Sequence, residues 1–81
     1  MQGKAIGSPA EEEIAADGEI LRMLLIDWRG PWTVDEIGRQ MDSPVEAADG
    51  VTRLARAGLV HRLDRFVFPT RTAARAAALN D

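Results

Sequence analysis

The chain has 81 residues, of which 46% are hydrophobic, and its net charge is −3. This length allows one small domain with one core, and the absence of cysteine excludes disulfides, thiolate zinc sites and cysteine nucleophiles. No segment approaches the ~18 consecutive apolar residues of a membrane span, and residues 1–10 do not resemble a signal peptide, so we expect a cytoplasmic protein without membrane contact. Residues 1–8 are predicted to be a disordered lead, and residues 9–81 a single domain.

The first predicted helix begins at Ser8, has three glutamates in its first turn and ends at about Trp28, before Gly30-Pro31. Its predicted core stripe comprises Ile14, Leu21, Leu25 and Trp28. Gly18 is expected on the same side, where it would permit a close approach. The apolar residues outside this stripe are Ile20, Met23 and Ile26. Because the helix is apolar over more of its circumference than one core needs, we expect a second packing partner, either the C-terminal helix or another copy in a homodimer.

Two helix-start signals lie ten residues apart, at Thr33 and Ser43. Each is followed three positions later by a glutamate, Glu36 and Glu46, and each pair is typical of a capping box. In a capping box the hydroxyl accepts from the backbone N–H of the glutamate, and the carboxylate reaches back to the N–H of the cap residue. The spacing leaves room for only about two helical turns between the two starts.

A helix over residues 34–41, a turn at Asp42 and a longer helix over residues 44–57 follow from these signals, which is the pattern of a helix-turn-helix. The inward residues are predicted to be Val34, Ile37, Met41, Ala47, Val51 and Leu54. Gly38 is expected where a neighbouring helix crosses closely. Trp32 is expected to plug the core, with a one- or two-residue strand as a further possibility.

A β-hairpin is predicted next. Gly58 suits a Schellman-type helix end, and alternating segments over residues 59–63 and 66–68 indicate two strands with Asp64-Arg65 at the tip. The tip lacks the usual Gly or Asn, so its geometry is open.

The last predicted helix covers residues 73–79, with Thr70 or Thr72 as its cap. The fold class is therefore mostly α with a small β-hairpin, in the order α-(β)-α-α-β-β-α. Phe66 and Phe68 share the same strand parity and are expected to face the core together, which would leave no aromatic surface for stacking RNA bases.

Residues 33–68 resemble the winged helix-turn-helix domain of prokaryotic transcription regulators, including the MarR-type repressors. The residues that carry the resemblance are Thr33-Val34-Asp35-Glu36-Ile37, Ser43-Pro44 and the block from Val51 to Val60 (VTRLARAGLV). The resemblance implies that the helix over residues 44–57 enters the major groove of duplex DNA and that the hairpin is a wing. The DNA-contacting candidates are then Ser43, Val45, Glu46, Asp49, Thr52, Arg53, Arg56, Arg62 and Arg65.

The distribution of charge along the chain is compatible with two functions, DNA binding and protein binding. Residues 1–50 carry −7 and residues 51–81 carry +4, so a basic C-terminal third favours a DNA-binding transcription regulator, expected to be a homodimer through the first helix. Glu46 and Asp49 depart from the family pattern, because carboxylates on a reading helix repel phosphates. They favour the alternative, a winged-helix module that binds another protein through the acidic face of this helix.

No catalytic, metal or cofactor site is expected. His61 is the single histidine and has no partner set for metal binding or catalysis. Ser8 and Ser43 are explained as helix caps, and no base is placed to activate either hydroxyl. We therefore expect that the chain is not an enzyme.

Overall fold

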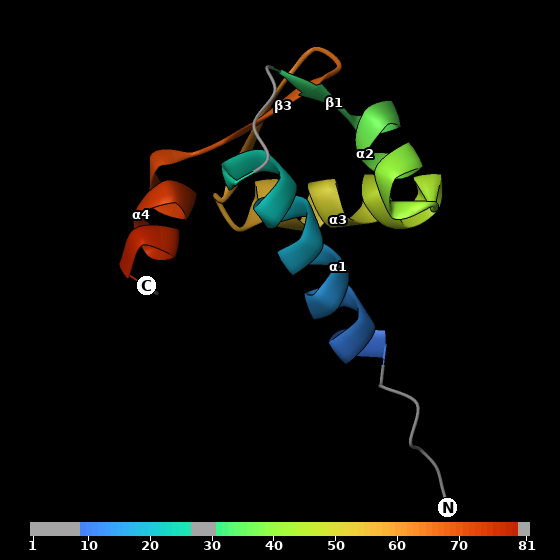
Figure 1. Ribbon diagram of the computed structural model, residues 1–81, viewed down its shortest axis with the longest axis horizontal. Helices are drawn as coiled ribbons and strands as arrows, with labels where there is room; N and C mark the ends of the chain where they lie inside the picture. Colours follow the sequence, from blue (N-terminus) through green and yellow to red (C-terminus); the bar gives the residue numbers. More distant parts are fainter. Residues whose placement is uncertain (1–8, 27–30, 80–81) are drawn as a thin grey trace, which may run out of the picture.

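The computed structural model describes residues 9–26 and 31–79. Its elements are α1 (Pro9–Leu25), β1 (Trp32–Thr33), α2 (Val34–Met41), α3 (Pro44–Arg56), β2 (Val60–Leu63), β3 (Phe66–Pro69) and α4 (Arg71–Leu79) (Figure 1). Within these residues the chain is mostly helical, with four helices and one antiparallel sheet of strand order β1-β3-β2. This confirms the predicted class of a mostly helical chain with a hairpin. No helix in this part of the chain has the length and apolarity needed to cross a membrane.

The predictions for residues 1–8, including the Ser8 cap, and for Trp28 lie outside the described residues. α1 ends at Leu25, earlier than expected. Its first turn projects beyond the rest of the molecule, whereas its later turns pass close to α3 (Figure 1).

The start of α2 has the complete capping box that its sequence predicts. Thr33 Oγ1 accepts from the Glu36 N–H at 3.1 Å, and Glu36 Oε1 accepts from the Thr33 N–H at 2.9 Å. Asp42 follows the last residue of α2 as its C-cap, and its φ of 60° lies in the left-handed region. A Cβ on Gly38 would lie 3.0 Å from Pro44 Cα, so this glycine lets α3 begin directly against α2, as expected.

The second capping box forms only in part. Ser43 Oγ accepts from the Glu46 N–H at 3.3 Å. The Ser43 N–H, however, donates to the Gly38 carbonyl at 2.9 Å, because the end of α2 needs that donor. The Glu46 carboxylate is therefore not drawn back to the cap and stays exposed on α3.

The far end of α3 is the predicted Schellman motif. Gly58 has a φ of 78°, its N–H donates to the Ala55 carbonyl, and the Leu59 N–H donates to the Leu54 carbonyl. Thr70 then joins the two ends of the hairpin, since its hydroxyl donates to the Gly58 carbonyl at 2.7 Å and accepts from a backbone N–H in the first turn of α4. The cap of α4 is thus Thr70 and not Thr72.

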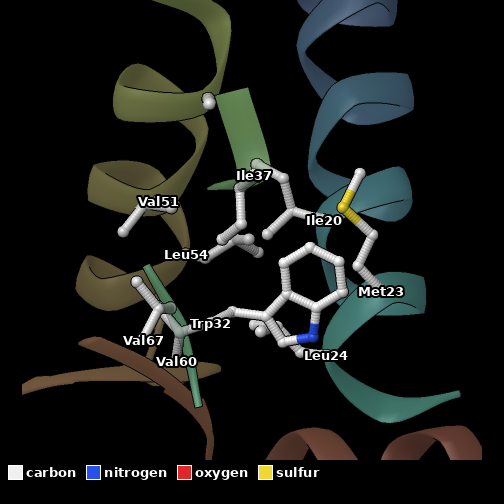
Figure 2. Packing of buried hydrophobic residues seen from close by; sticks show 10 residues of the cluster. Ile20, Met23, Leu24, Trp32, Ile37, Val51, Leu54, Val60 and Val67 are labelled. Atoms are coloured by element: carbon white, nitrogen blue, oxygen red, sulfur yellow. The ribbon is translucent and has the colours of Figure 1, made fainter. Parts of the chain in front are cut away.

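The core lies between α1, α2, α3 and the inner face of the sheet (Figure 2). Its largest fully buried side chains are Ile20, Leu24, Ile37, Val51 and Val67. Trp32 is both a core side chain and part of the two-residue strand β1, paired with Val67.

The predicted core stripe of α1 was wrong in part. Leu21 packs against the core as expected and is half-buried. The buried residues, however, are Ala16, Ile20, Met23 and Leu24, whereas Ile14 is 70% exposed and Gly18 faces open space. The position of α3 explains the difference. A Cβ on Gly50 would lie 2.5 Å from Ile20 Cδ1, so Gly50 admits the Ile20 side chain and selects that face of α1 for the core.

The expected orientation of the two phenylalanines was also wrong. Val67, which lies between Phe66 and Phe68, takes the core position opposite Trp32 and is fully buried. Since side chains alternate along a strand, Phe66 and Phe68 lie on the outer face of the sheet, where both are half-buried.

Candidate nucleic-acid interface

The outward side of α3 carries Val45, Asp49, Thr52 and Arg56, which we call the outer stripe. These residues lie opposite the buried positions of the helix, and all but the half-buried Thr52 are exposed. Thr52 Oγ1 donates to the Ala48 carbonyl at 3.0 Å, so its donor is already used within the helix. The stripe therefore offers one carboxylate and one guanidinium and is close to neutral.

Arg53 is held by α1 and does not have the free side chain expected of a phosphate contact. Its Nη2 lies 2.8 Å from Asp17 Oδ1, its Nε lies 3.2 Å from both Asp17 carboxylate oxygens, and Nη1 lies 3.8 Å from Glu13 Oε2. The hydrogen bonds to Asp17 raise the pKa of Arg53. Two-pronged pairing of this kind fixes the guanidinium more firmly than a single contact.

An acidic recess lies between α1 and α3. We define it by its lining residues Glu12, Glu13, Ala16, Glu46, Asp49 and Arg53. Four carboxylates therefore surround one guanidinium, which Asp17 also engages. Even so, no group of three or more His, Asp or Glu side chains within residues 9–26 and 31–79 is placed to hold a metal ion. The recess repels phosphate from this side of α3.

Sequence reasoning missed this recess. The three glutamates near the start of α1 are explained locally by the favourable interaction of anions with a helix N-terminus, and no local signal relates them to α3. One signal was present: Glu13 and Asp17 are four positions apart and therefore share a face of α1. That face could be assigned to Arg53 only once the crossing of the two helices was known.

The hairpin presents its arginines on two sides. Arg62 pairs with Val67 across the strands and so leaves the sheet on the Val67 face. Arg65 lies in the turn, and its Cζ is 5.8 Å from the centroid of the Phe66 ring, which lies on the opposite face. Both arginines are exposed. Asp64, also in the turn, has a φ of 60°, which aspartate tolerates better than most residues.

An apolar groove runs between α1 and α4. It is lined by Gly18, Leu21, Arg22, Leu25, Ile26, Leu59, Ala73, Ala76 and Ala77. Ile26 is 78% exposed. α4 thus covers only part of the apolar surface that α1 has beyond the core.

Of the nine candidates, the structure brings Arg56, Val45, Asp49 and Thr52 together on the outer stripe. It places Ser43 at the helix cap, and Glu46 and Arg53 in the acidic recess, which Asp49 also borders. Arg62 and Arg65 lie apart from these, on the hairpin. Comparison with family models, curated protein sequences and solved structures finds no match to this chain.

Proposed function

We propose that the chain is a winged helix-turn-helix domain that binds duplex DNA and serves as a transcription regulator. In this proposal α2 and α3 are the helix-turn-helix, the β2–β3 hairpin is the wing, and the wing makes the leading contact. The observation that carries the proposal is the pair of exposed arginines on the β2–β3 hairpin, which follows the tightly joined helices α2 and α3 in the chain.

The turn between α2 and α3 supports this assignment through its geometry. The Gly38 contact with Pro44 and the left-handed Asp42 allow a short helix to be followed at once by a longer one. The sheet then returns the chain beside α3 and carries the hairpin. The outer stripe of α3 and the hairpin remain accessible to a ligand at the same time.

The distribution of charged side chains supports the wing as the first part of the domain to contact DNA. Arg53 is engaged by Asp17, and the acidic recess repels phosphate from that side of α3. Of the DNA-contacting candidates, the cations left for phosphate are then Arg56, Arg62 and Arg65, which are all exposed. Three neutralised phosphates per copy correspond to a log–log salt slope of about −3.

A salt titration with charge-matched variants tests the proposal. Fluorescence anisotropy measures binding to a labelled duplex as salt is raised, for the wild type, for Arg62→Ala with Arg65→Ala, and for Arg71→Ala with Arg75→Ala on α4. Both double variants remove the same charge, but only the wing pair is expected to lower the slope, by about two. A folded wild type that binds no duplex at low salt would overturn the proposal.

A protein-binding module is the second candidate, and the acidic recess is the observation that favours it. Glu46→Lys with Asp49→Lys separates the two functions. If DNA is the ligand, the added cations strengthen duplex binding. If a basic protein is the ligand, the same change weakens its capture and the wild type does not bind DNA.

We further propose that two copies associate through the apolar surface of α1 beside Ile26. A two-fold dimer would present two α3 helices about one DNA turn apart.

A further inference from the structure

We infer that Leu63 is an apolar wedge, which the wing inserts between base pairs from the minor groove while Arg62 and Arg65 contact the flanking phosphates. The inference rests on the proposed DNA binding and adds to it a residue that selects deformable DNA. It concerns the wing alone and does not involve the outer stripe of α3.

The placement of Leu63 is the first observation. It is the last residue of β2, beside the two-residue turn, and it is 60% exposed. The core uses Val60 and Val67 from the hairpin instead. A single exposed leucine is common on protein surfaces, but this one lies at the tip of the hairpin between two arginines. Its pairing with Phe66 across the strands still leaves it largely exposed.

The apolar neighbour of Leu63 is the second observation. Leu63 pairs with Phe66 across the strands, so the two side chains form one apolar edge on the outer face. The Arg65 guanidinium lies over the Phe66 ring, with its Cζ 5.8 Å from the ring centroid. The tip therefore presents an apolar edge with a cation beside it, which suits insertion into a base step next to a phosphate.

The chemistry of the tip then indicates which DNA it fits. Apolar side chains such as leucine are the groups that minor-groove proteins insert between base steps, and insertion kinks the duplex toward the major groove. TA steps unstack readily, whereas A-tracts are stiff and have a narrow groove that favours an inserted arginine. A wing that acted only through its arginines would therefore prefer A-tracts, and a leucine wedge prefers TA steps.

The test compares two duplexes of equal base composition, one of alternating TA and one with an uninterrupted A-tract. Anisotropy gives the affinities, end-to-end energy transfer gives the bend, and 2-aminopurine in place of one adenine reports unstacking. The variant is Leu63→Ala, and the matched control is Leu79→Ala, which makes the same truncation at an 80% exposed leucine on α4, outside the hairpin and α3.

For the wild type and Leu79→Ala we expect several-fold tighter binding to the alternating duplex, a bend and a rise in 2-aminopurine fluorescence. Leu63→Ala is expected to lose all three and to keep the salt slope of the wild type. If the wild type binds both duplexes without bend or unstacking, or if Leu63→Ala retains the TA preference, the wedge is overturned while DNA binding stands. Failure of the folded wild type to bind either duplex would overturn the proposed function, and the wedge with it.

Discussion

Gly50→Ala is the substitution that tests most directly how α1 crosses α3. The added methyl would lie 2.5 Å from Ile20 Cδ1 and 3.1 Å from Asp17 Oδ1. Ile20 is fully buried and has little room to move. The added methyl group is therefore too close both to a core side chain and to the carboxylate that pairs with Arg53. Gly18→Ala is the matched control, because Gly18 lies inside α1 with nothing within 4 Å of its Cβ position.

The two variants share one favourable effect and differ in another. Alanine stabilises a helix interior by about 1 kcal/mol relative to glycine, and overpacking a filled core costs about 1–3 kcal/mol. Gly18→Ala is thus expected to stabilise the fold by about 1 kcal/mol, and Gly50→Ala to be neutral or destabilising by up to about 2 kcal/mol. For a chain of 81 residues, 1 kcal/mol corresponds to roughly 6 °C in Tm.

Urea and thermal unfolding followed by circular dichroism measure both variants under the same conditions. Equal stabilisation by the two alanines would refute the reasoning, since it would mean that Gly50 has as much space as Gly18. A loss of stability in Gly50→Ala alone supports the close crossing and with it the position of the acidic recess.

Three further predictions concern charge and association. The hydrogen bond from the Thr33 N–H holds the pKa of Glu36 below its ordinary value of 4.5. The ionised carboxylate therefore stabilises the fold above that pH, and this contribution is lost as pH falls through the folded-state pKa. Thermal unfolding should find Glu36→Gln less stable than the wild type at neutral pH and equal to it in acid. Asp17→Asn combined with Glu13→Gln removes both carboxylates that pair with Arg53 and should strengthen duplex binding in the anisotropy assay, with a salt slope steeper by about one; an unchanged slope would contradict that role of the pairing. Ile26→Asp should convert a dimer to a monomer in light scattering, and a wild-type monomer would reject the proposed association.

The parts of the fold that sequence reasoning predicted are those that local chemistry determines. Thr33 and Glu36 need only each other and the intervening turn to begin a helix. Gly58 ends α3 because glycine adopts a left-handed conformation without a Cβ penalty. The spacing between these signals then sets the element order, whatever the rest of the chain does.

The parts that it missed depend on choices between faces. α1 has apolar residues around most of its circumference, so periodicity alone could not decide between the faces of Ile14 and Ile20. Along the hairpin, the run Phe66-Val67-Phe68 is apolar at every position, so alternation could not tell which side faces inward. In each case a contact with a distant element made the choice: Gly50 for α1, and Trp32 for the strand.

The arrangement of charged side chains at the site also depends on contacts between distant elements, and it bears on the proposed function. Among the described residues, α1 draws Arg53 into the acidic recess, and Arg65 lines a pocket together with Asp35 and Glu36 of α2. The charge asymmetry of the sequence is therefore kept only in part on the surface, with carboxylates beside the start of α3 and the exposed Arg62 and Arg65 at the hairpin. A polyanion would be turned by this field so that the hairpin meets it first. In the proposed DNA binding, we therefore expect the hairpin rather than α3 to make the leading contact.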